Sequence, residues 1–226
     1  MCKQSRSSVR NEIYDLMKRL LILFLVFVSI QTHGQIRKNR PLFWVTPSID
    51  TRINGLASGF IINSMKDVDS SLTTEINGLN IELIGVGLFL PLAPSSPIYF
   101  EDASFYYDSE NVDSIVDSYD FARYRINGVS FSFGGLGGHD INVNGINLSG
   151  INTLTGKTNG LSACILINIT GVANGVTIGG LINNTIQTKG LQIGLLNKTI
   201  KLRGFQIGLW NENEKRSFPL INWNFN

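Results

Sequence analysis

Apolar and polar residues alternate along much of the chain after residue 52, in short segments that each begin with a glycine. After Gly190, for example, Leu191, Ile193 and Leu195 alternate with Gln192 and Gly194. A period of two residues places the two sets on opposite faces of a β-strand. We therefore predict strands with one buried face, and we expect Ile193 and its apolar neighbours to point inward and Gln192 to point outward.

These segments form an internal repeat. Residues 190–197 read GLQIGLLN and residues 204–211 read GFQIGLWN, and from Gly145 onward the opening glycine recurs every 14 or 15 residues. The opening glycines are Gly55, Gly78, Gly128, Gly145, Gly160, Gly175, Gly190 and Gly204. All but the last two follow an asparagine. Because Asn and Gly both tolerate positive φ, we expect a turn before each strand.

Two closed all-β architectures suit such repeats, a parallel β-solenoid of 14–15-residue coils and, as the alternative, an outer-membrane β-barrel. Parallel stacking would place Gln192 on Gln206 and Ile193 on Ile207, in continuous columns. A membrane barrel requires aromatic girdles, yet no aromatic residue lies between Phe133 and Phe205. The solenoid is therefore the favoured fold. The C-terminal aromatic residue Phe225 is the best argument for the barrel.

The amino end has the pattern of an export signal. Lys18 and Arg19 precede an apolar run from Leu20 to Ile30. This run is too short to span a hydrocarbon core of about 30 Å, so we interpret it as a secretory signal cut before Gln35.

The chain then divides by its pattern. We assign residues 1–34 to the signal peptide (with Met17 as an alternative start), 35–52 to an N-terminal cap segment, 53–91 to degenerate repeats, 92–125 to an acidic and aromatic insert, 126–216 to the regular repeat array and 217–226 to a C-terminal cap. Solenoids need atypical terminal units to cover their last coils.

Composition and candidate chemistry add little that points to catalysis. Past residue 34 the chain has 14 Lys plus Arg and 15 Asp plus Glu, which gives no case for nucleic-acid binding. Cys164 would be the only cysteine after signal removal, and we interpret it as a small hydrophobic residue. His139, in an expected turn, has no partners at metal-ligand spacing. The glycines of residues 134–138 lack the lysine of a phosphate loop, so they indicate a bulge or turn.

The insert holds seven acids between Glu101 and Asp120 and no Lys or Arg in that interval. Its carboxylate pairs, such as Glu101 with Asp102 or Asp117 with Asp120, lack the spacing and glycine of a calcium-binding loop. We expect solvated charge on a surface loop, although insertions in repeat folds often form a binding face. The sequence thus predicts no catalytic, cofactor-binding or metal-binding residue.

The tandem GLQIGLLN and GFQIGLWN segments, followed by RSFPLINWNF at residues 216–225, resemble the repeats of bacterial surface-repeat protein families. The resemblance covers residues 145–225 well and residues 53–140 more loosely. It implies an exported, envelope-associated protein and transfers no catalytic residue.

Together these features predict an exported structural or interaction module at the cell surface, outer membrane or periplasm, and not an enzyme. Envelope lipid, polysaccharide and another surface protein are the partners that we consider. The basic residues of the last coils, Lys189 and Arg203 among them, suit the anionic members of that set. A small outer-membrane barrel is the alternative, and a polysaccharide-active β-helix enzyme is a more remote one.

Overall fold

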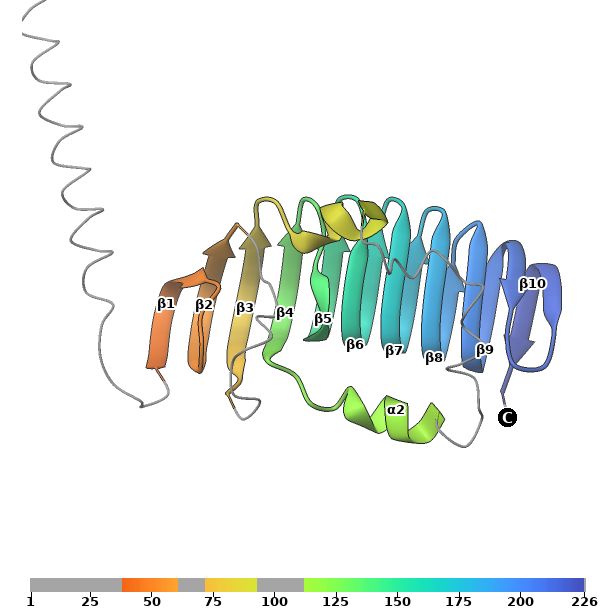
Figure 1. Ribbon diagram of the computed structural model, residues 1–226, viewed down its shortest axis with the longest axis horizontal. Coiled ribbons are helices and arrows are strands. Elements are labelled where there is room, and N and C mark those ends of the chain that lie inside the picture. Colours follow the sequence, from red (N-terminus) through yellow and green to blue (C-terminus); the bar gives the residue numbers. More distant parts are fainter. Residues whose placement is uncertain (1–37, 61–71, 93–111, 226) are drawn as a thin grey trace, which may run out of the picture. The chain divides into compact units, whose positions relative to one another are not determined.

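The computed structural model describes residues 38–60, 72–92 and 112–225, which are mostly β-structure (Figure 1). The strands are β1 (Lys38–Thr46), β2 (Thr51–Gly59), β3 (Thr74–Glu82), β4 (Tyr124–Ser132), β5 (Gly137–Ser149), β6 (Thr153–Cys164), β7 (Ile167–Gly179), β8 (Ile182–Ile193), β9 (Leu196–Glu212) and β10 (Ser217–Asn224). Two short helices, η1 (Val86–Leu92) and α2 (Val112–Ser118), complete the described structure. The ten strands form one sheet in sequence order.

The fold is the predicted parallel β-solenoid, with about nine turns about 15 residues apart. Every strand from β1 to β8 pairs in parallel with the next, and the repeat glycines are in register, as for Gly145 with Gly160. The predicted columns are confirmed, since Gln192 pairs with Gln206 and Ile193 with Ile207. β1, which lies within the segment 35–52, pairs in the same register with β2.

Each repeat glycine lies inside a strand and not in a turn before it, so the prediction of Asn-Gly turns is wrong. Gly128 lies within β4 with a φ of +137°. A Cβ placed there would lie 2.2 Å from the carbonyl oxygen of Gly78 in the preceding coil. The glycine therefore serves two purposes: it adopts a backbone conformation that other residues rarely reach, and it lets successive coils stack closely.

The two faces of the strands are inverted relative to our prediction. Gln192 and Gln206 are both fully buried, at 0% exposure, whereas Ile207 is 42% exposed. The Gln206 side-chain amide donates to Oε1 of Gln192 at 2.8 Å, and Asn222 donates to Oε1 of Gln206. In-register stacking places identical amide side chains one strand spacing apart, so each amide can bond to the one in the next coil. These amides therefore remain hydrogen-bonded although they are buried.

The interior changes character along the array. Its amino-terminal part holds a hydrophobic cluster of Ile53, Ala57, Ile76, Tyr124, Ile126, Leu136, Ile141 and Val143, with Trp44 packed against it. From β6 to β8 the corresponding positions are more polar, before the column returns to the fully buried Leu202 in β9. Thr158, Ala173 and Thr188 follow Val143 in the same column, and Thr185 accepts a hydrogen bond from Gln192.

The last strand reverses direction. β10 pairs antiparallel with β9, and its register shifts between Phe218 and Leu220. Of the helices in the described ranges, none has the length and hydrophobicity needed to cross a membrane.

Candidate interaction surface

Each coil presents two different outer faces, one on either side of its repeat glycine. We number positions from that glycine. The side chains at +2 and +4 point inward, and those at +1 and +3 point outward. The +1 column, continued onto the first and last strands by pairing, is Phe43, Leu56, Leu79, Val129, Ile146, Leu161, Val176, Leu191, Phe205 and Trp223. The +3 column is Val45, Ser58, Ile81, Phe131, Leu148, Ala163, Ile178, Ile193, Ile207 and Ile221.

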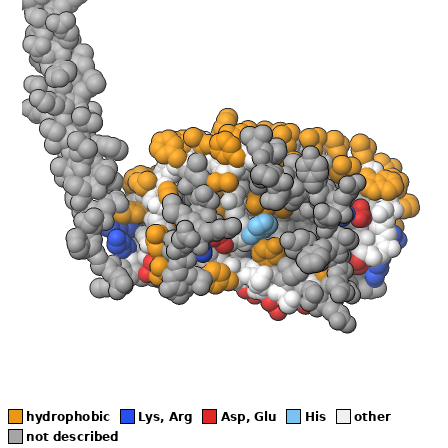
Figure 2. All heavy atoms as spheres, viewed as in Figure 1, with side chains coloured by type: hydrophobic (Ala, Val, Ile, Leu, Met, Phe, Trp, Pro, Cys, Tyr) orange, Lys and Arg blue, Asp and Glu red, His pale blue; other side chains and the backbone are white. Residues whose placement is uncertain are grey.

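These two columns, with the exposed apolar residues at +5 and +6, make up what we call the outer apolar face. Residues at +5 and +6 with high exposure are Phe60, Leu83, Ile84, Phe133, Ile165, Leu181, Leu195, Leu196, Leu209 and Trp210. Figure 2 shows apolar side chains along the upper edge of the array, toward which the arrowheads of β3 and β4 point in Figure 1. No charged residue occupies the +1 or +3 column.

The size of this face distinguishes it from ordinary surface. Ten strands at about 4.8 Å spacing and five residues at about 3.3 Å each give an area on the order of 700 Å². The largest apolar patch on a typical monomer measures roughly 300–600 Å², and larger patches mark interaction sites. The outer apolar face is therefore the best candidate for a functional surface.

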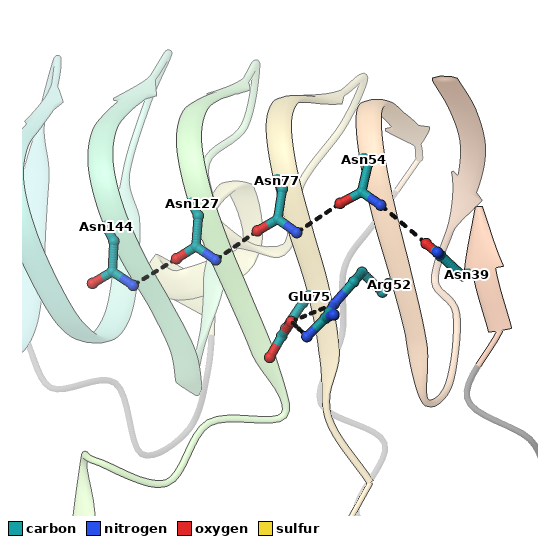
Figure 3. Close-up of polar contacts among 7 residues, drawn as sticks. All are labelled: Asn39, Arg52, Asn54, Glu75, Asn77, Asn127 and Asn144. Atoms are coloured by element: carbon teal, nitrogen blue, oxygen red, sulfur yellow. Dashed lines mark hydrogen bonds and ion pairs between the residues drawn. The ribbon is translucent and has the colours of Figure 1, made fainter. Parts of the chain in front are cut away.

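On the other side of the glycine, the −1 column forms an asparagine ladder (Figure 3). The side-chain amide of each asparagine donates to Oδ1 of the asparagine in the preceding coil, at 2.6–3.0 Å. The ladder runs through Asn54, Asn77, Asn127, Asn144, Asn159 and Asn174, and Asn54 donates to Oδ1 of Asn39, which lies two residues before the −1 position of β1. Two columns further, Arg52 and Glu75 form an ion pair at 2.9 Å. From β2 to β9 the −1 column of this outer face is polar throughout.

The ladder ends where the sequence changes from asparagine to a cation. Oδ1 of Asn174 is buried and accepts no hydrogen bond from any described residue. Lys189 and then Arg203 occupy the next two places in the column. Both side chains are exposed. Their charges thus lie at the border between the polar face and the outer apolar face.

The described part of the insert lies against the polar side of the coils. Asp113 of α2 pairs with Lys201 at 2.6 Å, and Asp120 pairs with Lys157. Asn142 donates to the carbonyl oxygen of Tyr119 at 2.7 Å. The expectation of solvated charge is confirmed for Asp113 and Asp120, whose side chains are 73% and 66% exposed, although each also pairs with a lysine of the array. Glu101 and Asp102 lie outside the described residues, whereas Asp117 is exposed.

The remaining sequence candidates do not come together as a site. His139 lies in strand β5 and not in a turn, and its ring is 6.2 Å from that of Tyr119. Partial desolvation lowers the pKa of His139, and the Asp140 carboxylate opposes that shift. Within the described ranges no group of three or more His, Cys, Asp or Glu residues could hold a metal ion.

Cys164 and the glycine-rich segment match their predicted structural roles. Cys164 is a buried free thiol, and burial raises its pKa to about 12, so it is a poor nucleophile in the folded protein. Gly134 and Gly135 lie in the turn between β4 and β5. A register shift follows between Gly138 and Asn142, which is the bulge or turn that the sequence indicates.

The sequence did not predict this candidate surface, because alternation defines two sets of residues without saying which set faces inward. Side-chain size carried the missing signal. The +4 column contains Gly59, Glu82, Ser132, Ser149, Cys164, Gly179, Gly194 and Gly208, which are mostly small. Phe131 and Phe205 belong to the other set, and stacked aromatic rings need more room than the interior of a flattened coil offers.

The chain matches no protein-family model, and neither the curated proteins nor the solved structures include one with significant similarity to it.

Proposed function

We propose that this protein is an exported structural or interaction module of the bacterial envelope that works through its outer apolar face and catalyses no reaction. One observation carries the proposal: the +1 and +3 columns extend over ten strands without a charged residue. A face of this size in contact with water is unfavourable, and burying it against a partner releases about 25 cal/mol for each Å².

The polar interior supports the same conclusion. A globular domain normally buries its large apolar side chains and exposes its amides. Here Gln192 and Gln206 occupy the interior while Ile207 and Phe131 lie outside. The apolar residues therefore do little for the core of the later coils, and a role in docking accounts for their position.

Fractionation of cells that express the full chain tests the proposal. The wild-type protein is expected in the envelope fraction with Gln35 as its first residue. A face variant, Phe131→Gln with Ile207→Gln, should fold but move to the soluble exported fraction. A matched control, Ser114→Gln with Ser118→Gln, places two glutamines on exposed positions of α2 and should fractionate like the wild type.

Two results would contradict the proposal. Retention of Met1 or Met17 in the isolated protein would overturn the export assignment. A face variant that is folded by circular dichroism and still fractionates with the envelope would show that the outer apolar face is not the docking surface.

A further inference from the structure

We propose that the outer apolar face docks on an anionic lipid leaflet, with the array lying flat so that its strands run parallel to the membrane surface. The inference rests on the proposed function and names the partner of the same face. The structural basis is the division of every coil into an apolar and a polar outer half at its repeat glycine. An amphipathic element of this kind lies in the membrane interface, its apolar side about 5–10 Å deep at the acyl boundary.

The cations at the border of the face match the position of lipid phosphates. Lys189 and Arg203 are one residue before their repeat glycines, whereas Leu191 and Phe205, one residue after them, belong to the apolar face. With the apolar columns among acyl chains, the two cations would lie at the level of the headgroups. Long basic side chains extend from an apolar site toward that level.

These two cations also differ from the other lysines of the later coils. Lys157, Lys198 and Lys201 are paired with Asp120, Glu212 and Asp113. No carboxylate among the described residues pairs with Lys189 or Arg203. Their charge is therefore available to an anion outside the chain, and near a charged leaflet each such residue adds to binding.

Aromatic residues gather at the same end of the array. Phe205 contacts Phe225 edge to face, with ring centroids 5.0 Å apart, and Arg216 lies over the ring of Trp223 at 4.4 Å. Trp210 is also half exposed. Tryptophan is enriched at membrane–water interfaces, because its ring is apolar and its N–H reaches polar groups. The last coils thus combine apolar area, aromatic rings and unpaired cations.

A lipid leaflet fits these features better than a second copy of the chain. A copy could cover the apolar columns, but from β2 to β9 its own border column contains only asparagine, lysine and arginine and supplies no anion for Lys189 and Arg203. A leaflet supplies both acyl chains and phosphates.

Vesicle flotation tests this inference. Residues 37–226 form a compact unit of their own, so this part is used without the apolar segment that precedes it. Vesicles of phosphatidylcholine alone are compared with vesicles that also contain phosphatidylglycerol. Three variants each introduce two glutamines: the face variant Phe131→Gln with Ile207→Gln, a border variant Lys189→Gln with Arg203→Gln, and the control Ser114→Gln with Ser118→Gln.

The wild-type protein and the control are expected to float with phosphatidylglycerol vesicles, and high salt should weaken that binding. The border variant should bind these vesicles about tenfold to thirtyfold more weakly and should bind neutral vesicles like the wild type. The face variant should bind both kinds of vesicle at least tenfold more weakly than the wild-type protein does.

Folded wild-type protein that floats with neither vesicle overturns the inference. Sedimentation velocity without lipid then identifies the alternative occupant: a dimer that the face variant abolishes would assign the face to a second copy. If flotation fails while envelope fractionation still depends on the face, the lipid assignment is wrong and the proposed function stands. If both fail, the proposed function is wrong as well.

Discussion

The earlier coils and the coils of β6 to β8 share one backbone but differ in the interior −2 column, which ends at the buried Leu202 of β9. In the −2 column, Ile53, Ile76 and Ile126 are fully buried in the earlier coils, whereas Thr188 holds the same place in β8 and hydrogen-bonds to Thr185 at 2.7 Å. In-register parallel pairing and the glycine column continue unchanged through both regions. The backbone ladder and the glycines therefore define the coil, and its interior can be filled by either aliphatic packing or hydrogen bonding.

Replacing a repeat glycine should have the largest effect, and it should be equally severe in both regions. In Gly128→Ala and Gly190→Ala the new Cβ would lie 2.2 Å and 2.0 Å from the glycine carbonyl oxygen of the preceding coil, at φ values of +137° and +139°. Because the obstacle is backbone, each variant should lose about 4 kcal/mol or more, measured by urea unfolding. A mild effect at Gly190 alone would show that the later coils do not depend on the glycine column.

The interior columns should differ in sensitivity. Ile126→Ala leaves a cavity in the hydrophobic cluster and should cost about 2–4 kcal/mol in the free energy of unfolding. Thr188→Ala, in the same column of the polar region, removes one hydrogen bond and should cost about 1 kcal/mol. Equal losses in the two variants would mean that both regions are held by the same kind of packing.

The inverted faces predict a pair of opposite outcomes at neighbouring residues. Gln206→Leu removes the partner of Gln192 and of Asn222 in the interior, so we expect a loss of about 1–3 kcal/mol in thermal or urea unfolding. Ile207→Thr changes an outward side chain, and Thr suits an exposed strand, so its effect should stay within about 0.5 kcal/mol. A larger loss for Ile207→Thr than for Gln206→Leu would instead support the sequence prediction, in which the isoleucine points inward and the glutamine outward.

The smallest expected effect is a gain. In Lys189→Asn the new amide could donate to Oδ1 of Asn174, which has no partner in the described part of the chain, and so extend the ladder by one residue. The gain should be about 0.5–1.5 kcal/mol in urea unfolding. The same substitution removes a border cation and should weaken binding to anionic vesicles, which separates stability from docking. A destabilised Lys189→Asn protein would show that the ladder cannot continue past β7.

The sequence was sufficient to predict the solenoid, because identical residues recur at one spacing and only parallel stacking brings each onto its equivalent, as with Gln192 and Gln206. It was not sufficient to predict the orientation of the strands. Burial of Gln206 is acceptable only because Gln192 and Asn222 lie beside it in the stack. This arrangement depends on residues of neighbouring coils, so the pattern within one strand does not predict it. For this reason the sequence placed the residues of the outer apolar face in the core.

The insert shows a second limit of local patterns. Asp113 and Lys201 are 88 residues apart in sequence and pair at 2.6 Å. The acidic composition of the segment correctly marks a departure from the repeat. Asp113 and Asp120 of the insert pair with lysines of later coils, and composition alone does not indicate which acid pairs with which lysine.

The reversed strand β10 has a consequence for assembly. Parallel in-register strands are the geometry of cross-β fibrils, in which every end is a template for another identical strand. At the carboxyl end of this array the hydrogen-bonding edge of β9 is already occupied by a strand that runs the opposite way, with a register shift at Leu220. A further chain arriving there would meet a reversed and irregular strand in place of a copy of its own edge. β10 therefore prevents a further parallel strand from pairing in register with β9.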